Sequence, residues 1–325
     1  MAALTRARYE DGVRLVVLAR QDVAGSWFHL SALLRQRGIA DARVVTLAHE
    51  PTHGWPVDIA DVFDGGQELE YLMRTADAFH LVDLLPDDVP LFDGLLARRC
   101  DGGASLSLQV DERSTPGHVR EVERVANERG ASVVTTRPHV VPNAEFLAPF
   151  IPLWRASWMP TCPGARARAR SAERIVFAST PGRLRDRPRL EALVERAELA
   201  SRELPDVRVE VLAGKPHGQV LQRRRRGHLT LVGGNGLGRT GLESLAQGVP
   251  VVAELSAAEH EAWSELAGAA PPVIDVFALE AAMDGLDRCI EPDPALRRWA
   301  EAAADPNRWL ARCSAWCAQS SRRAA

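Results

Sequence analysis

The sequence predicts an α/β protein of two domains, each built on a mainly parallel sheet. The first observation is that short apolar runs alternate with segments of helical spacing from end to end. The second is the length of 325 residues, which suits two domains with separate cores. The third is a restart of the alternation after 160–170, which is rich in Pro, Gly, Ala and Arg. We interpret that stretch as a hinge or linker, with an ordinary surface loop as the alternative.

The first half predicts an N-terminal domain over 1–160. Its strands are expected where the chain has short apolar runs, at 13–19, 42–47, 78–82, 106–110 and 132–136. Its helices are expected where apolar residues recur at helical spacing, at 27–37, 68–74 and 115–129. Gly38 marks the end of the first helix, because glycine readily adopts the left-handed conformation that closes a helix.

The second half predicts a C-terminal domain over 171–306. The expected strands are 174–178, 207–212, 229–232 and 249–253, and the expected helices include 189–202 and 240–247, with a short one after 212. Beyond Phe277 the chain becomes mostly helical, and Trp299, Trp309 and Trp316 are spaced as apolar anchors. A last helix is expected within 307–325.

Composition excludes few classes of function. Hydrophobic residues make up 46% and charged residues 26% of the chain, as in ordinary globular proteins, and the net charge of −3 gives no electrostatic reason to expect nucleic acid or an anionic membrane. The run Arg223–Arg226 is interpreted as a solvated helix end, with a phosphate or nucleic-acid contact as the alternative. Five scattered cysteines favour free thiols over a zinc site. Without an apolar N-terminal segment or a membrane-length apolar run, we expect a cytoplasmic protein.

The most informative segment is 229–254, where a strand, a glycine-rich turn, a short helix and a second strand follow one another. Glycines allow a ligand to approach the backbone, and the start of a helix offers free N–H groups to an anion. The segment therefore predicts a site for a phosphate-bearing ligand. A simpler interpretation is a helix start without a ligand, because Thr240 and Glu243 have the spacing of a capping box.

A second interpretation is a dinucleotide site. Gly236, Gly238 and Gly241 match G-x-G-x-x-G after a strand, and Glu254 ends the next strand where a ribose-binding acid is expected. Two observations weigh against it. The expected helix has only about two turns, and the fingerprint comes late in the chain, whereas a dinucleotide-binding domain normally opens with it.

A third interpretation rests on the run Asn235-Gly-Leu-Gly-Arg-Thr-Gly-Leu-Glu243 and the following Ser-Leu-Ala-Gln-Gly-Val-Pro-Val-Val. It resembles the donor-site signature E-G-F-G-x-x-x-x-E-A-x-A-x-G-x-P-V of GT-B glycosyltransferases, most closely the retaining group 1 (GT4-like) enzymes. The resemblance implies two Rossmann-like domains facing a cleft, with C-terminal helices packing back on the N-terminal domain. The helix within 307–325 would be the one that crosses back.

The resemblance also implies roles for individual residues of the donor site. Glu243 takes the position of the glutamate that binds the donor ribose, and the turn Gly236, Leu237, Gly238, Arg239 and Thr240 faces the diphosphate. Asn235 replaces the glutamate that contacts the sugar hydroxyls, and an amide can hydrogen-bond a hydroxyl but carries no charge.

Cations for the diphosphate are expected in the loop after strand 174–178. Arg183 and Arg185 resemble the family's Arg and Lys, although Asp186 stands where glycine is usual. They would stabilise the charge that the departing nucleoside diphosphate gains. Lys215, with His217 as a second candidate, lies in a loop that resembles one near the nucleotide base.

Acceptor-side candidates come from the ends of the N-terminal strands. Gly25 and Asp22 lie in the loop after the first strand, and Asp111 follows strand 106–110. His80 resembles the family's strand-end histidine near the transferred sugar. A packed, hydrogen-bonded core histidine is the alternative.

The predicted function is transfer of a sugar from a UDP- or GDP-linked donor to an acceptor hydroxyl, retaining and independent of a bound metal. No cofactor is expected beyond the nucleotide sugar as co-substrate. The acceptor is open among a glycan, a lipid, a metabolite, a protein and a modified DNA base, and no stable membrane insertion is expected. The alternatives are an NAD(P)-dependent oxidoreductase and a non-catalytic nucleotide-sugar binding protein.

Overall fold

The computed structural model divides the chain into two compact units. The first holds the described residues up to Phe150 and from Pro306 onward, and the second holds those from Ile151 to Asp305. The structure describes residues 12–20, 25–47, 66–89, 94–110, 115–137, 141, 144–155, 173–180, 184, 187–233, 236–286 and 292–323. The predicted linker at 160–170 lies outside them.

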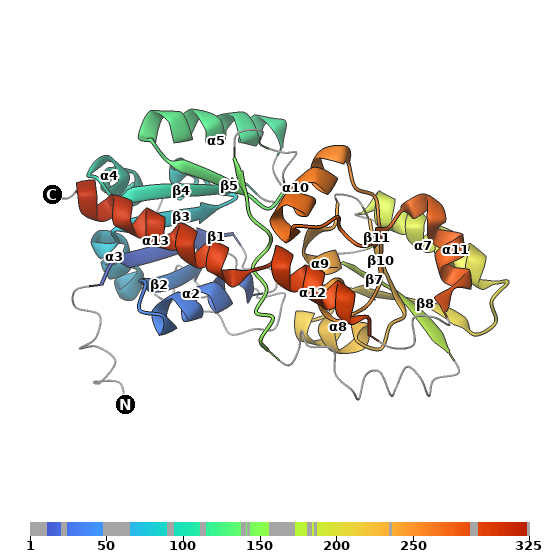
Figure 1. Cartoon of the computed structure of the whole chain (residues 1–325). Coiled ribbons are helices and arrows are strands. Elements are labelled where there is room, and N and C mark those ends of the chain that lie inside the picture. The colour runs from blue at the N-terminus through green and yellow to red at the C-terminus, as the bar shows by residue number, and fades with distance from the viewer. Residues whose placement is uncertain are drawn as a thin grey trace. The chain divides into compact units, whose positions relative to one another are not determined.

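The first unit is built on a parallel sheet with the strand order β2-β1-β3-β4-β5-β6 (Figure 1). Its strands are β1 (Arg14–Ala19), β2 (Asp41–Thr46), β3 (Ala78–Val82), β4 (Ser105–Val110), β5 (Ser132–Thr135) and β6 (Glu145–Phe146). Because β1 pairs with both β2 and β3, the chain leaves β1 toward one edge and then returns to its other side. Such a reversal creates a crevice at the carboxyl ends of the two central strands.

Helices cover both faces of this sheet, and alternate residues of β1 show how the two cores are built. Leu15 and Val17 pack with Trp27 on one face, whereas Val16 and Leu18 pack on the other. The first face is covered by α2 (Ser26–Gln36) and α13 (Pro306–Arg323). The second is covered by α3 (Gly66–Thr75), α4 (Leu95–Asp101) and α5 (Pro116–Arg129).

The second unit has its own parallel sheet with the order β11-β10-β9-β7-β8. Its strands are β7 (Arg174–Thr180), β8 (Val207–Ala213), β9 (Leu229–Val232), β10 (Val251–Ala253) and β11 (Val273–Ile274). Strand β7 pairs with β8 on one side and with β9, the central strand, on the other. The order repeats that of the first five strands of the other sheet, so each unit has one switch point.

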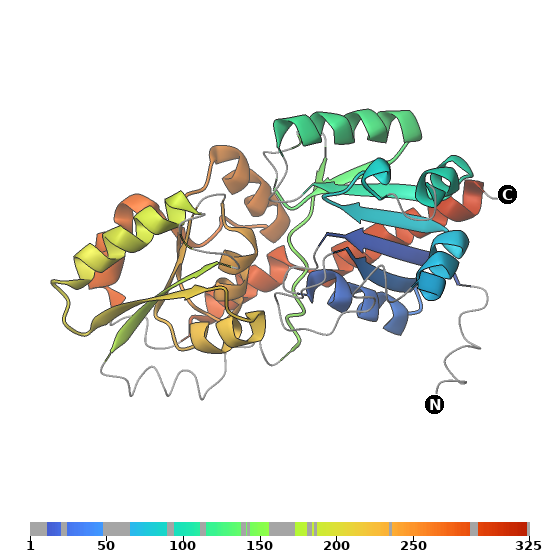
Figure 2. The same cartoon turned by 180° about the vertical axis from the view of Figure 1, so that it is seen from behind.

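The helices of the second unit are α7 (Pro188–Ser201), α8 (His217–Arg224), α9 (Gly238–Ala246), α10 (Ala257–Ala267), α11 (Leu279–Asp284) and α12 (Pro294–Ala303). The helices α7 and α11 lie side by side, as both views show (Figures 1 and 2). They share a core with the strands, to which Leu193, Leu231 and Met283 belong. On the other face, Val220 of α8 packs with Phe177 and Leu212.

The last helix, α13, packs into the first unit, as the predicted fold class requires. Trp309 donates a hydrogen bond from Nε1 to the carbonyl of Ala148 at 2.8 Å, and Cys313 and Trp316 are buried in the core of α2 and the sheet. By contrast, α12 stays in the second unit and packs on α9 and α10. Of the described C-terminal helices, α13 is therefore the one that returns.

Most expected elements appear within a few residues of their predicted bounds, because the apolar periodicity marks the buried face directly. The helix expected at 240–247 begins earlier, at Gly238, and the strand expected at 249–253 begins at Val251, after Pro250. Among the α-helices and strands of the described residues, α4, α10, β6 and β11 have no counterpart in the sequence analysis.

Candidate functional site

The switch point of the second sheet places the glycine-rich turn. Neighbouring strands β7 and β9 are parallel, so their carboxyl ends, at Thr180 and Val232, lie at the same edge of the sheet. Gly233 follows β9 directly, and an added Cβ there would lie 2.2 Å from Cα of Leu190 in α7. Glycine at 233 therefore lets α7 approach the end of β9. Ligands of open parallel sheets bind at such a position.

The turn itself needs glycine at two positions. Gly236 has φ +73° and Gly238 has φ +50°, a region that residues with a Cβ avoid. Leu237 between them is fully buried and precedes the first residue of α9 without any side-chain cap. Free N–H groups at an uncapped helix start attract an anion.

The capping-box interpretation of Thr240 and Glu243 is wrong. Since α9 begins at Gly238, Thr240 lies inside the first turn, and its carbonyl accepts hydrogen bonds from Arg224 Nη1 and Ser244 Oγ. A capping box does form at the start of α10, where Ser256 is the N-cap and Glu259 is its partner. The sequence carries the same spacing at both places, and only the true helix start decides between them.

Glu243 lies at the centre of a buried group of charges. Its carboxylate receives Arg224 Nη2 at 2.6 Å, Arg239 Nε at 2.8 Å and His217 Nε2 at 2.9 Å. The side chains of Glu243 and Arg224 are 3% and 1% exposed, whereas those of His217 and Arg239 are 13% and 15% exposed. We call these four residues the Glu243 cluster. Its outer members are the ones that a ligand can reach.

Burial and the neighbouring charges determine the charge state of this cluster. Burial opposes ionisation of Glu243, yet the surrounding positive charges hold the pKa of its carboxyl well below the usual range. Burial also lowers the pKa of His217, more than the neighbouring Glu243 raises it. We therefore describe His217 as neutral near pH 7, with Nε2–H donated to the carboxylate. Within the cluster, two guanidinium groups then face one carboxylate.

Arg224 joins α8 to α9. Besides Glu243, it reaches Gln247 Oε1 at 3.3 Å and the carbonyl of Thr240 at 3.1 Å. It belongs to the basic run 223–226, which was interpreted as a solvated helix end or a phosphate contact. Its neighbour Arg223 fits the first interpretation, since it is exposed and pairs with Glu210. Arg224 fits neither, because it is buried among protein partners.

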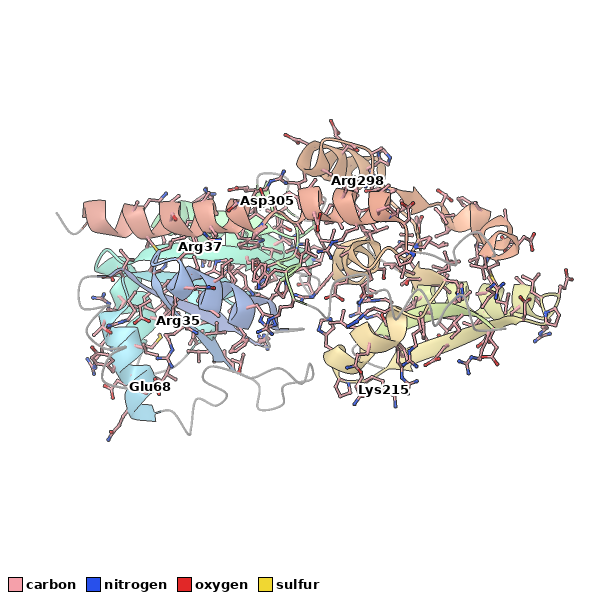
Figure 3. The ribbon with its side chains drawn as sticks, turned by 60° about the horizontal axis from the view of Figure 1, so that its bottom comes forward. Arg35, Arg37, Glu68, Lys215, Arg298 and Asp305 are labelled. Atoms are coloured by element: carbon pink, nitrogen blue, oxygen red, sulfur yellow. The ribbon has the colours of Figure 1, made fainter. Side chains whose placement is uncertain are left out.

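The other predicted donor-side residues are placed as follows. Lys215 is exposed in the turn before α8 (Figure 3). Gly241 makes close packing possible rather than ligand contact, since an added Cβ would lie 2.4 Å from Leu237 Cδ1. Glu254, the acid of the dinucleotide interpretation, is exposed and lies 3.6 Å from Arg189. Arg183, Arg185 and Asn235 lie outside the described residues.

On the acceptor side, Gly25 has φ +69° and is the N-cap of α2, directly beyond the loop after β1. Asp22 and Asp111 lie outside the described residues. Asp83, after β3, has φ +51° and is the non-glycine residue with positive φ in the described part of the chain. Left-handed backbone at such a residue is uncommon and often marks a functional site. Nothing in the sequence around Asp83 predicted this backbone conformation.

The expected strand-end position of His80 is wrong. It is the middle residue of β3 and fully buried, stacked on Trp316 with ring centroids 4.7 Å apart. Its ring nitrogens lie 3.1 Å from Ser107 Oγ and 3.2 Å from Gln109 Oε1. Burial lowers the pKa of His80 to about 3, against the opposing effect of the Gln109 hydrogen bond. These contacts are those of a packed, hydrogen-bonded core histidine, the alternative that the sequence left open, and a catalytic role for His80 stays a prediction.

Two absences concern the described residues only. No described helix is long and apolar enough to cross a membrane. Within the same part of the chain, no group of three or more His, Cys, Asp or Glu side chains is arranged to hold a metal ion.

No family model matches the sequence, and no curated protein matches it. The chain is similar to the solved structure of a glycosyltransferase from Rickettsia africae ESF-5, with 10% identity and a TM-score of 0.55 over 93% of this chain and 97% of the other. It is also similar to a sucrose-phosphate synthase from Thermosynechococcus elongatus, with 14% identity and a TM-score of 0.48 over 95% and 98%. That second similarity is too loose to carry an argument. The first shows a shared fold, and with the two parallel sheets it confirms the predicted GT-B fold class.

Proposed function

We propose that this protein is a glycosyltransferase that moves a sugar from a UDP- or GDP-linked donor to an acceptor hydroxyl. The observation that carries the proposal is the Glu243 cluster, in which two guanidinium groups gather around one carboxylate in α8 and the first turns of α9. It adjoins an uncapped helix start at the carboxyl edge of β9. Two independent sources of positive potential thus favour an anion at the same turn.

Sugar transfer from a nucleotide donor requires a site that stabilises an anion. As the bond between the sugar and the diphosphate breaks, negative charge builds on the departing phosphate oxygens, and fixed donors stabilise it more than they stabilise the ground state. Arg239 is the cluster member best placed for this work, being partly exposed and held by Glu243 Oε1. From the sequence resemblance, Arg183 and Arg185 are expected to add further charge. Retention of configuration and independence from a metal also follow from that resemblance.

The ribose contact of Glu243 remains a prediction. Both of its oxygens already accept hydrogen bonds from the protein, and its side chain is 3% exposed. A role of Glu243 in donor binding is supported by its contacts with Arg239 and His217, the two partly exposed members of the cluster. Glu243 would then act through its partners, with ribose contact as an additional step.

A non-catalytic nucleotide-sugar binding protein is the second candidate, because Asn235 replaces the family's sugar-binding glutamate with a neutral amide. The oxidoreductase interpretation has less support. It assigns the ribose to Glu254, which lies on the surface beside Arg189.

A thermal-shift panel of UDP, GDP, ADP, their glucose conjugates, NAD and NADP tests the proposal. A ligand that binds the native state alone raises the melting temperature with its occupancy. We expect stabilisation by one nucleoside diphosphate and its sugar conjugate, followed by slow hydrolysis of that conjugate. Binding without hydrolysis or transfer would favour the binding protein, and stabilisation by NAD or NADP alone would overturn the proposal.

A further inference from the structure

A buried carboxylate from α10 lies against the glycine-rich turn. We propose that Glu259 is a positioning residue of the donor site, which holds the turn at Gly236 in place. The inference rests on the proposed function, because that turn is where the donor diphosphate is expected. Glu259 was not among the residues that the sequence indicated.

The contact between Glu259 and the turn depends on glycine at position 236. A Cβ added to Gly236 would lie 1.7 Å from Glu259 Oε1 and 2.7 Å from its Cδ. The carboxylate therefore occupies the space where any other residue would carry its side chain. With φ +73° as well, glycine is needed at 236 both for the backbone conformation and for this approach.

Glu259 is held firmly on its own helix. Its Oε2 accepts hydrogen bonds at 2.9 Å from both the backbone N–H and the Oγ–H of Ser256, and Ser256 Oγ accepts from the Glu259 N–H at 3.3 Å. This capping box fixes one carboxylate oxygen, while the other contacts the turn. Only 6% of the residue is exposed, so it acts on a ligand through the turn.

The helix that carries Glu259 is itself tied to α9. Trp263 of α10 is buried and lies 5.9 Å from Trp299 of α12, between ring centroids. From α12, Arg297 donates to the carbonyl of Ala246 at the end of α9 at 3.0 Å. The turn before α9 and the end of α9 are thus both held by α10 and α12, which pack on each other. Loss of the Glu259 contact would free the turn while the rest of α9 stays fixed.

The direct test measures the affinity of UDP, GDP and ADP by titration calorimetry, at a temperature where every variant is folded. Glu259→Ala should weaken binding of the preferred nucleotide about tenfold, because the turn would no longer be held in the conformation that binds the diphosphate. Glu259→Gln keeps the shape and the capping hydrogen bonds and should restore most of the affinity. The matched control is Glu261→Ala on the exposed side of the same helix, which should bind like the wild type.

A second measurement does not depend on any ligand. Gly236→Ala should lower the melting temperature because its methyl group meets the Glu259 carboxylate. In the double variant Gly236→Ala, Glu259→Ala that collision is gone, so the loss should be smaller than the sum of the two single losses. Simple additivity would mean that the side chain and the turn do not interact.

The outcomes separate the two proposals. If none of the three nucleotides binds the wild type, the proposed function fails, and the melting temperatures still decide whether Glu259 holds the turn. If the wild type binds a nucleotide and Glu259→Ala binds it equally well, the proposed function stands and the positioning role is overturned. Equal weakening by Glu261→Ala would also overturn it.

Discussion

The two units share a strand order but differ in what they place around their central strands. In the first, the middle of β3 carries His80, a neutral residue enclosed by Trp27 and Trp316. In the second, the helices flanking β9 bury Arg224 and Glu243 as a charged pair. A parallel sheet provides the same crevice in both cases. The difference shows that, among the described residues, the buried ion pair of Arg224 and Glu243 belongs to the second unit, while the middle of β3 in the first unit is packed against aromatic rings.

The largest expected effect is on stability, from breaking the buried pair. Arg224→Met removes a buried guanidinium and leaves the Glu243 carboxylate with less compensation, which should cost about 3 kcal/mol of the free energy of unfolding. Denaturant titration measures the loss. The control is Arg223→Met, one residue earlier, whose exposed pair with Glu210 should contribute about 1 kcal/mol or less. Similar losses for the two variants would contradict the distinction between them.

The next effect belongs to the first unit and appears in acid. Because the pKa of His80 is lowered to about 3 in the folded protein, the unfolded state binds a proton that the folded state does not between about pH 6.5 and pH 3. Stability should therefore fall as the pH falls through this window, with His80 contributing about 2 kcal/mol of loss by pH 5. In His80→Phe, unfolding titrations at pH 7 and pH 5 should show a correspondingly smaller difference. An unchanged difference would show that His80 is protonated in the native core.

A smaller effect is expected on nucleotide binding, and only in variants of the second unit. Arg239→Ala should weaken binding of the preferred nucleoside diphosphate about tenfold, as expected for loss of one charged hydrogen bond of roughly 1.5 kcal/mol. Calorimetry at pH 7 measures it. Arg196→Ala is the matched control, because Arg196 is a half-exposed arginine of α7 paired with Glu280. His80→Phe, in the other unit, should bind the nucleotide like the wild type.

The smallest expected effect concerns surface ion pairs of the first unit. Arg124 contacts Glu121 and Glu128 along α5, and all three side chains are well exposed. Solvent and salt screen such pairs, so Arg124→Ala should leave both the melting temperature and nucleotide affinity within experimental error. A clear drop in melting temperature would mean that these exposed pairs contribute as the buried one does.

Most strands and helices could be predicted from the sequence because the apolar pattern that marks them is local. Runs such as Leu229–Val232 mark buried strands by themselves, and the glycine-rich turn after that strand was recognisable from its spacing. The structural role of each individual glycine could not be predicted. Gly241 completes a fingerprint in the sequence but serves packing against Leu237, whereas Gly236 makes room for a carboxylate 23 residues later in the chain.

The contacts between side chains of the site could not be predicted, because they join residues that are far apart in the sequence. Arg224 is one of four consecutive arginines, and nothing local distinguishes the one that turns inward to meet Glu243. The spacing of Ser256 and Glu259 did carry a usable signal, the capping box that begins α10. That spacing was noted at Thr240 and Glu243, as one of three interpretations, but not at Ser256 and Glu259, so α10 and the contact of Glu259 with the turn were missed.

Hydrogen exchange with and without nucleotide tests most directly whether the second unit carries the donor site. With saturating UDP or GDP, we expect slower exchange in 236–246 and 215–224, the segments that hold the turn, α9 and α8. The aromatic core around His80 should keep its exchange rates. Protection confined to the first unit, or slower exchange with NAD in place of both nucleotides, would show that the second unit does not carry the proposed donor site.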